Sequence, residues 1–370
     1  MLEKKKILYC ASTASHLRNF HLPYMQQLQQ MGYRITACVN QYDALPFTDE
    51  VAVVPFHKKI TSPENIKNII RVYRLLKQQQ FHAISVHTTL AAAVVRAAVL
   101  LLPKQQRPKV FYTCHGYLFN EKGGLGKWKY LLPEKICAGA TNVLMVMNQE
   151  DERIARKQKL YKDNLIFIPG MGVDFTRFDL RQDKAELRQQ YEISEEDVLF
   201  VFAGEFSHRK NQQELIRAFA RAVKQMPNAK LVLAGDGALL DTCKQSVEEM
   251  NLQEKIIFAG HVNNMPELYR VCDICVSASR IEGLPFNIME AMYCELPCAA
   301  SSIKGHADLL QHGQNGYLYE SEAELAEYMV RLYQNTQLRH QMGVQAKQNV
   351  SPYALDIVQP VVMQVYEENL

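Results

Sequence analysis

The sequence predicts an α/β protein with two domains, each built on a doubly wound parallel sheet. Short runs rich in β-branched and aromatic residues alternate with amphipathic segments of helical period. This alternation is typical of parallel sheets that are covered by helices on both faces. It occurs as two separate series, and 370 residues exceed the roughly 250–300 residues at which one hydrophobic core stops growing. Two Rossmann-like domains follow from these observations.

The first series predicts six strands separated by helices. The expected strands are 5–12, 33–40, 51–56, 82–88, 109–116 and 142–148. Helices are expected over 20–32, over 65–80, from Leu90 onward, and in a segment that ends near Ala138. In the helix over 65–80, apolar residues recur at helical spacing and predict one buried face. That predicted face is made of Ile66, Ile69, Ile70, Tyr73 and Leu76.

The second series repeats the pattern after a segment rich in turn-forming residues, IPGMGVDF at 168–175. The expected strands are 198–205, 230–237, 255–262, 273–279 and 296–302, with helices between them. We therefore place an N-terminal domain at 1–170 and a C-terminal domain at 171–351. A last helix in 352–370 is expected to cross back to the N-terminal domain.

The composition argues against a membrane-spanning or a secreted protein. No apolar run approaches the roughly 20 residues that span a membrane, and the short apolar run near the N-terminus predicts a first strand, not a secretion signal. Nine scattered cysteines indicate buried thiols in a reducing cytosol. Cys272 and Cys275 form a C-x-x-C without a second pair at zinc-ligand spacing.

Charge is distributed unevenly along the chain. Residues 1–170 hold 24 Lys and Arg against 11 Asp and Glu, whereas residues 171–370 hold 18 against 28. A basic N-terminal half favours an anionic surface or substrate. No nucleic-acid-binding motif accompanies it, so nucleic acid is not an expected partner.

A stretch of the second half, SRIEGLPFNIMEAM, carries two glutamates around a predicted helix start. Pro285 suits the first turn of a helix, and a helix N-terminus attracts phosphate. Glu282 precedes that site, and Glu290 lies within the helix. Two carboxylates on either side of a phosphate site can accept hydroxyl groups from two polyols joined by a diphosphate, as in a nucleotide sugar. The alternative is that both are solvated helix charges.

A second segment, AGEFSHRKNQQELI, supplies cations after another strand. Arg209 and Lys210 stand where a diphosphate would meet a second helix. The sequence contains no Asp-x-Asp, the usual metal and diphosphate ligand pair, so neutralisation of a leaving diphosphate is expected to come from these cations without a metal or another cofactor. Taken alone, the two side chains could simply be solvated.

The motifs together resemble the family-4 retaining glycosyltransferases of the GT-B fold, in which two such domains face a cleft. S-R-x-E-G-x-P-x-x-x-x-E-A-M is matched from Ser279 to Met292, and G-x(5)-K-N by Gly204, Lys210 and Asn211. IPGMGVD, AGHVNNMPELY and SIKGHADLLQHGQNGYLY are similar to further family segments. FHLPYM and YTCHGY most resemble the bacterial capsule and exopolysaccharide branch.

The resemblance implies a role for each candidate residue. Glu290 would bind the ribose, Glu282 would contact the donor sugar near the reacting carbon, and His115 would lie near the sugar. Glu282 and His115 are thus the catalytic candidates, and His16 and His87 belong to the acceptor side. A structural role is the alternative for each histidine. The implied nucleotide-binding set is Gly204, Arg209, Lys210, Val262, Gly283, Leu284, Pro285, Phe286 and Glu290, with the backbone near Val262 reading the base.

The chain departs from the family pattern at three places. Glu205 stands where the family often has Arg, which leaves Arg209 as the expected replacement. Glu295 stands where the family usually has Gly, and we expect a packing role there. The first loop, ASTASHLRNF, lacks the paired glycines of many relatives, so the acceptor side is expected to differ.

The resemblance implies a retaining hexosyltransferase that uses a UDP-sugar, such as UDP-GlcNAc, UDP-GalNAc or UDP-galactose, in surface polysaccharide biosynthesis. The acceptor would be a lipid-linked saccharide, and the enzyme would be cytoplasmic and peripheral on the anionic inner membrane. The basic N-terminal domain, with Trp128 as an interfacial anchor, would make that contact. The alternatives are a transferase for a soluble acceptor, a nucleotide-sugar epimerase of the same fold, and a non-catalytic nucleotide-sugar binder.

Overall fold

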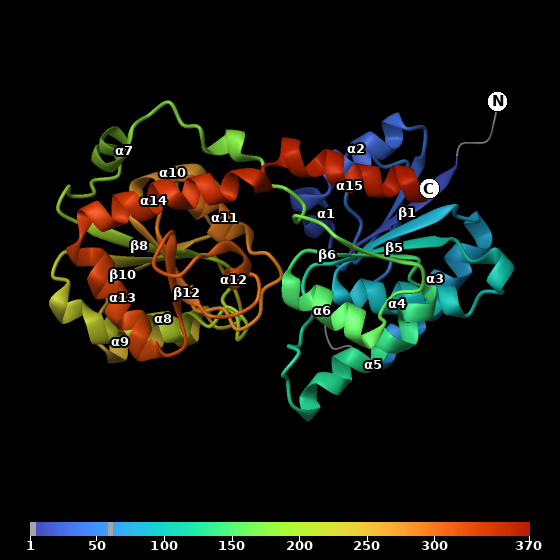
Figure 1. Ribbon diagram of the computed structural model, residues 1–370, viewed down its shortest axis with the longest axis horizontal. Coiled ribbons are helices and arrows are strands. Elements are labelled where there is room, and N and C mark those ends of the chain that lie inside the picture. The colour runs from blue at the N-terminus through green and yellow to red at the C-terminus, as the bar shows by residue number, and fades with distance from the viewer. Residues whose placement is uncertain (1–4, 58–61) are drawn as a thin grey trace. The chain divides into compact units, whose positions relative to one another are not determined.

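The computed structural model describes residues 5–57 and 62–370, and it divides the chain into two compact units. Unit 1 comprises Met1–Gly172 together with Asp356–Leu370, and unit 2 comprises Val173–Leu355. The borders lie two and four residues beyond the expected borders at 170 and 351. Each unit is an α/β layer structure (Figure 1).

Unit 1 contains a seven-stranded sheet in the order β3-β2-β1-β4-β5-β6-β7. Every neighbouring pair is parallel, and the order reverses at β1, so the sheet is doubly wound as predicted. The strands are β1 (Lys6–Cys10), β2 (Arg34–Val39), β3 (Glu50–Val53), β4 (Ala83–His87), β5 (Lys109–Cys114), β6 (Val143–Val146) and β7 (Asn164–Phe167).

Helices cover both faces of this sheet, with α4, α5 and α6 on one face and α1, α2 and α15 on the other (Figure 1). The helices are α1 (Ala14–Phe20), α2 (Leu22–Gln30), α3 (Pro63–Gln79), α4 (Thr89–Leu100), α5 (Trp128–Cys137), α6 (Gln149–Gln158) and α15 (Leu355–Asn369), with 3-10 turns Lys104–Gln106, Leu125–Lys127 and Ala138–Ala140. The C-terminal α15 packs on unit 1 through Tyr366, whose hydroxyl lies 2.6 Å from Ser85 Oγ and whose ring lies beside Phe111.

The apolar helix α4 carries a charge in its buried face. Arg96 is fully buried and donates to Glu134 of α5 at 2.8 Å and to Thr141 Oγ1 at 3.2 Å. Its guanidinium also lies 4.0 Å from the centre of the Tyr112 ring. A buried charge of this kind is tolerated only when it is paired and hydrogen-bonded, so these contacts fix how α4 and α5 pack.

The predicted buried face of α3 is partly wrong. Ile66 and Ile70 are 66% and 41% exposed, whereas Asn65 and Asn68 are buried beside Val72 and Leu76. Asn68 Nδ2 donates to Pro55 O at 2.8 Å, and Asn65 donates to His57 O at 3.1 Å. The asparagines satisfy backbone groups of the preceding loop, and this turns the two isoleucines outward.

Unit 2 contains a six-stranded parallel sheet in the order β10-β9-β8-β11-β12-β13. The strands are β8 (Val198–Ala203), β9 (Ala229–Ala234), β10 (Ile256–Gly260), β11 (Ile274–Ser277), β12 (Cys298–Ser301) and β13 (Gly316–Tyr319). The helices are α7 (Lys184–Gln190), α8 (Gln212–Ala222), α9 (Leu240–Glu249), α10 (Met265–Val271), α11 (Phe286–Tyr293), α12 (His306–Leu309), α13 (Glu322–Gln334) and α14 (Thr336–Val350), with 3-10 turns Phe175–Phe178, Val223–Gln225 and Ser351–Tyr353.

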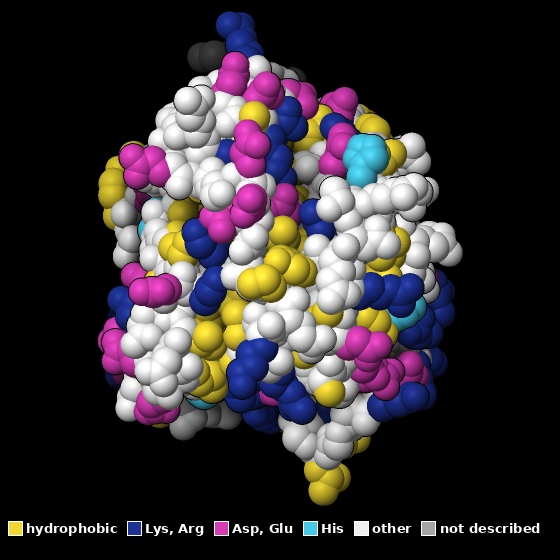
Figure 2. All heavy atoms as spheres, turned by 90° about the vertical axis from the view of Figure 1, so that its left-hand side faces the viewer, with side chains coloured by type: hydrophobic (Ala, Val, Ile, Leu, Met, Phe, Trp, Pro, Cys, Tyr) yellow, Lys and Arg dark blue, Asp and Glu magenta, His cyan; other side chains and the backbone are white. Residues whose placement is uncertain are grey.

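Unit 2 has a face on which charged and apolar side chains are mixed (Figure 2). Acidic and basic side chains are interspersed on the face that Figure 2 shows, and Arg217 and Arg221 of α8 both pair with Glu322 of α13. Among the described residues, no helix combines the length and the apolar character that crossing a membrane requires.

Candidate functional site

The loops that follow the strands of unit 2 meet at the carboxyl edge of its sheet, where ligands of such sheets bind. Backbone hydrogen bonds tie these loops together. They run from Phe206 N–H to Asp236 O (2.8 Å), from Gly235 N–H to Gly260 O (2.7 Å) and from Arg280 N–H to Arg209 O (2.8 Å). The loops after β8, β9, β10 and β11 therefore form one connected edge.

Two glycines allow close approach at this edge. A Cβ at Gly204 would lie 3.1 Å from the Phe202 ring and 3.5 Å from Lys210 Cε, so the glycine leaves room for the lysine side chain. Gly305, which follows β12, has φ +81, and a Cβ there would lie 2.6 Å from Gly283 O and 3.2 Å from Glu282 Cβ. A larger residue at 305 would push the loop away from Glu282.

The predicted residues Glu282, Arg209 and Lys210 come together as one charged cluster. Lys210 Nζ donates to Glu282 Oε1 at 2.7 Å, and Arg209 donates to Glu282 Oε2 at 2.9 Å. The Glu282 and Lys210 side chains are 7% and 11% exposed, whereas Arg209 is 41% exposed. One carboxylate thus holds two cations, and the cluster keeps a net positive charge.

The cluster fixes the charge state of Glu282. Burial would raise its pKa, but Lys210 and Arg209 outweigh burial and lower the pKa to about 2. His306 contributes weakly to this lowering and is itself buried, with its ring nitrogens close to Ser277 and Ser301. Burial lowers the pKa of His306, so Glu282 is an anion and His306 is neutral at pH 7.

Helix α11 begins next to this cluster. Pro285 is its N-cap, with φ −78 and ψ 117, one position earlier than the predicted first helical position. Asn287 Nδ2 donates to Ala203 O at 2.8 Å and ties the helix start to the end of β8. Gly283 and Leu284 are buried just before the helix, and Phe286 is half-buried at its first position. Lys210 binds Glu282, which lies three residues before the N-cap Pro285. The positive end of the helix dipole therefore begins next to the charged cluster.

Glu290 lies in the second turn of α11 and has a different environment. Among the described residues, its carboxylate has no hydrogen bond or ion pair, and burial raises its pKa to about 7 although Arg177 opposes the shift. A half-buried carboxyl group without a partner is costly. It is chemically suited to accept hydrogen bonds from a ligand's hydroxyl groups.

The structure also describes three other positions discussed in the sequence analysis: Val262, Glu205 and Glu295. Val262 is half-buried in the loop between β10 and α10. Glu205 is exposed, whereas Arg209 reaches the cluster, which is consistent with Arg209 as the replacement cation. Glu295 has φ +61 and pairs with Lys347 at 3.0 Å. Its left-handed backbone explains why glycine suits this position.

In unit 1, the predicted histidines gather at the carboxyl edge of the sheet. His16 belongs to α1, His87 ends β4 and His115 follows β5. His115 Nε2 lies 3.4 Å from His87 Nδ1, and the His16 and His115 rings meet edge to face at 4.8 Å. His21, which was not predicted from the sequence, lies between α1 and α2, and its ring centre is 3.9 Å from that of His87, with the ring planes tilted by 43°.

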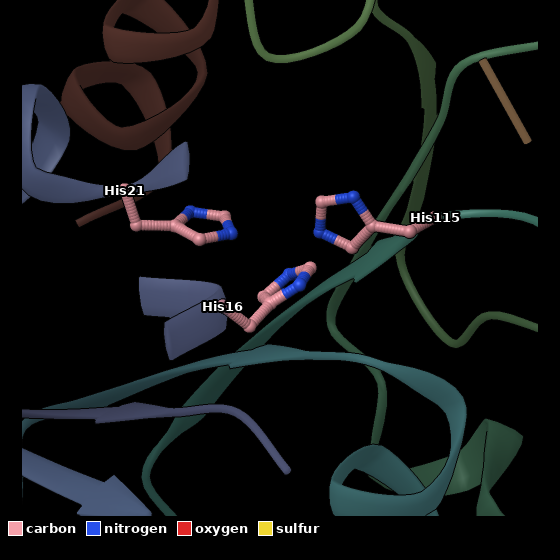
Figure 3. Close-up of side chains that lie close together, drawn as sticks. All are labelled: His16, His21 and His115. Atoms are coloured by element: carbon pink, nitrogen blue, oxygen red, sulfur yellow. The ribbon is translucent and has the colours of Figure 1, made fainter. Parts of the chain in front are cut away.

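Burial keeps these four imidazoles neutral. It lowers the pKa of His16 to about 4 and lowers the pKa of the other three well below the usual value. Potential ligand nitrogens of His16, His21 and His115 all lie within 4.8 Å of one another, and Figure 3 shows the three rings turned toward a common centre. This is the arrangement in unit 1 that could hold a metal ion.

His21, His306 and Arg280 were not predicted as site residues from the sequence. Arg280 donates to Asn211 Oδ1 at 3.3 Å and so links the two predicted motifs. No local signal marks His21, because its neighbours Tyr9 and His87 come close to it only through the fold. His306 follows β12 in the same way that other site residues follow their strands, and this position could have indicated it.

Comparison with known proteins identifies the family. The model of Glycosyltransferase Family 4 matches residues 24–177, and the model of Glycosyl transferases group 1 matches residues 183–349. The chain is a family-4 glycosyltransferase. It is 29% identical over 348 residues to EpsD of Bacillus subtilis (strain 168), which is named as a glycosyltransferase; the match covers 93% of this chain and 91% of EpsD.

Two other proteins place this family-4 glycosyltransferase among relatives of known name and fold. It is 28% identical over 269 residues to the UDP-Gal:alpha-D-GlcNAc-diphosphoundecaprenol alpha-1,3-galactosyltransferase of Escherichia coli. This match covers 71% of this chain and 68% of the galactosyltransferase. The structure of Anabaena HepE in complex with UDP and glucose has a TM-score of 0.77, 19% identity and complete coverage of both chains. The family-4 glycosyltransferase therefore has the GT-B fold predicted for it.

Proposed function

We propose that this glycosyltransferase moves a hexose from a UDP-sugar to a lipid-linked saccharide, with retention of configuration, in bacterial surface polysaccharide biosynthesis. The observation that carries the proposal is the charged cluster in which the buried Glu282 holds Lys210 and the exposed Arg209 beside the start of α11. The Escherichia coli relative, whose name contains both UDP-Gal and a diphosphoundecaprenol acceptor, supports the substrate classes. The HepE complex with UDP supports the nucleotide.

In this proposal, Lys210, Arg209 and the N-terminus of α11 bind the diphosphate of the donor. The two cations and one carboxylate leave a net positive charge, and Arg209 is exposed enough to leave Glu282 for a phosphate oxygen. Glu282 would keep Lys210 extended before the donor arrives and would then accept hydroxyl groups of the sugar. Gly204, Gly283, Leu284, Pro285 and Phe286 would line the diphosphate side.

Glu290 is proposed to bind the ribose, and the backbone near Val262 the base. The Glu290 carboxylate lacks a partner among the described residues and has a pKa of about 7. Two ribose hydroxyl groups would supply the missing hydrogen bonds and would favour the ionised form. Binding of the ribose would thus remove the free-energy cost that the unpartnered carboxylate has in the free protein, and this would favour binding.

The transfer would rest on stabilisation of the leaving diphosphate. As the sugar carbon becomes oxocarbenium-like, negative charge grows on the diphosphate, and Lys210, Arg209 and the helix dipole would offset it. These groups would neutralise the leaving diphosphate without a divalent metal. EDTA is therefore expected to leave UDP binding by unit 2 unchanged.

The acceptor is proposed to bind at the carboxyl edge of unit 1, where His16, His87 and His115 lie. His115 is the proposed catalytic histidine of this side. Because these side chains are neutral, they would contact saccharide hydroxyl groups by hydrogen bonds and would not bind an anionic group by charge.

Unit 1 is proposed to dock on the anionic inner surface of the membrane through α3 and α5. On α5, Trp128, Leu132 and Ile136 are 46%, 53% and 60% exposed and recur every four residues along one face. On α3, Ile66 and Ile70 are exposed beside basic residues. The basic residues near these apolar residues in the sequence are Lys67, Arg71, Arg74, Lys122, Lys129 and Lys135. Apolar side chains among lysines and arginines favour an anionic interface.

The test is a transfer assay with purified protein. Radiolabelled UDP-GlcNAc, UDP-GalNAc and UDP-galactose would each be offered with an undecaprenyl-diphosphate saccharide, with a soluble saccharide, and without acceptor. The proposal predicts label in the lipid fraction with an anomeric configuration that NMR shows to be retained. Label in the soluble saccharide alone would contradict the lipid-linked acceptor, and a new sugar epimer without acceptor would indicate an epimerase.

A further inference from the structure

The histidine cluster of unit 1 contains polar atoms that need a partner. His16 Nε2 and His21 Nε2 are buried and have no hydrogen-bond partner among the described residues. A buried polar atom that makes no hydrogen bond costs free energy, and each such atom calls for an explanation. Here two of them belong to neighbouring rings, whose centres are 5.1 Å apart.

We propose that His16, His21 and His115 form a binding site for a zinc-like divalent ion in unit 1. Their ligand nitrogens lie within 4.8 Å of one another. Zinc binds imidazole nitrogen at about 2.0–2.1 Å, so three nitrogens on a tetrahedral ion are roughly 3.4 Å apart. Rotation of the side chains can close this difference, and the rings already face a common centre (Figure 3).

The neighbours of the three rings are suited to this role. Tyr9 OH lies 3.1 Å from His21 Nδ1, so the hydroxyl orients the ring and leaves Nε2 toward the centre. Metal-bound histidines commonly have such a partner on the second nitrogen. His115 Nε2 makes only a long 3.4 Å contact with His87 Nδ1, which a bond to a metal can replace.

The three imidazole ligands determine which metal ions the site can bind. Three neutral imidazoles without a carboxylate suit zinc, copper, nickel or cobalt and do not suit magnesium or calcium, which prefer oxygen ligands. Three histidines leave a fourth position for water. This site differs from the diphosphate cluster of unit 2 but shares His16 and His115 with the proposed acceptor side, where a bound ion would take the place of their direct contacts with hydroxyl groups. Metal binding can be measured without the transfer reaction.

The experiment measures metal binding by the full chain without any substrate. EDTA-treated protein, with Cys294→Ser as background because Cys294 is the one cysteine that is not buried, is titrated with Zn²⁺ by calorimetry and with Co²⁺ by visible absorption. We expect one equivalent of each ion and a Co²⁺ spectrum of nitrogen and oxygen ligands without sulfur charge-transfer bands.

Variants locate the site. His16→Gln and His115→Gln should each weaken Zn²⁺ binding by at least about 100-fold, since loss of an outer partner alone costs 10–100-fold. His82→Gln, an exposed histidine of the same unit, is the matched control and should bind like the background protein. Thermal melts of each variant without metal confirm folding, and His16, which is only half-buried, is the substitution least able to disturb it.

Three outcomes would overturn the site. They are an absence of Zn²⁺ binding at one equivalent, binding that both cluster variants retain, and a sulfur-ligated Co²⁺ spectrum. Transfer activity does not enter these readouts, so a failure of the metal site and a failure of the proposed function are distinguishable.

Discussion

The clusters of titratable side chains at the carboxyl edges of the two sheets have opposite charge states: the cluster is ionised in unit 2 and neutral in unit 1. In unit 2, Glu282 is held between Lys210 and Arg209, and its pKa falls to about 2 because the cations outweigh burial. In unit 1, His21 and His87 are buried and His115 is half-buried, none of them beside a carboxylate of the described residues, and their pKa values fall because burial favours the neutral ring. One edge is charged and the other is neutral.

This difference in charge determines which ligand each edge can accept. A cluster with excess positive charge and a nearby helix N-terminus suits a diphosphate. Neutral rings with unpartnered nitrogens suit hydroxyl groups or a metal ion and offer nothing to an anion. The same parallel-sheet framework thus provides two sites with distinct chemistry, and the following predictions test that contrast.

The largest effect is expected for Lys210→Ala. Loss of the buried cation should lower kcat/KM for sugar transfer by about 100- to 1000-fold, the range seen when one charge-stabilising donor is removed. Lys230→Ala is the matched control, because Lys230 also donates to a carboxylate, Asp197, at 2.7 Å in the same unit. Lys230 lies at the start of β9, far along the strand from the carboxyl edge, and its loss should change the rate little. Equal losses in both variants would contradict the account.

Glu282→Gln should destabilise unit 2 in a pH-dependent way. The folded pKa of about 2 lies below the ordinary value of 4.5, so the ionised group stabilises the fold above pH 4.5 and this contribution is lost as pH falls through 2. Two and a half pKa units correspond to a contribution of the order of 3 kcal/mol. Urea unfolding of wild type and variant at pH 7 and at pH 3 measures it. A stability difference that does not shrink in acid would show that Glu282 is not the paired anion.

Glu290 should give UDP binding its own pH dependence. If only the carboxylate binds the ribose, affinity should rise with pH up to about 7, the pKa of the free protein, and then level off. Below pH 7 the loss should approach tenfold per unit at most. Glu290→Gln should bind more weakly and lose this dependence. Calorimetry with UDP between pH 5.5 and 8.5 tests the prediction, and a slope that survives in the variant would contradict it.

The smallest effect is expected for a substitution in unit 1, and it concerns binding to membranes. Trp128→Ser should reduce binding to vesicles that contain anionic lipids several-fold, because an interfacial aromatic ring is lost. Tyr42→Ser is the control, since Tyr42 is 73% exposed in the loop after β2, away from α5. Co-sedimentation with anionic and neutral vesicles measures both variants. Equal binding by wild type and both variants would argue against docking through α5.

The alternation of strands and helices was enough to predict the fold class, because parallel strands buried on both faces leave a clear apolar pattern. β7 and β13 escaped prediction; β7, NLIF, is an edge strand with exposed ends and carries little of that pattern. The face of α3 was predicted wrongly, because periodicity cannot foresee that Asn65 and Asn68 are buried to satisfy backbone groups of a loop.

The charged site was predictable in its members but not in its pairing. The sequence indicated Arg209 and Lys210 as diphosphate-site cations and Glu282 as a carboxylate just before the phosphate site. It could not show that the carboxylate holds both cations, since the residues are more than 70 positions apart and meet only through the fold. His21 was missed for the same reason, because its partners Tyr9 and His87 lie on two other strands.

The most direct test of the central claim compares UDP, UMP and uridine by calorimetry on wild type and Lys210→Ala. If the cluster binds the diphosphate, wild type should prefer UDP over UMP by tenfold or more, and the variant should lose most of that preference while uridine binding stays the same. A preference for UDP that Lys210→Ala retains, or an absence of UDP binding by the wild type, would contradict the account.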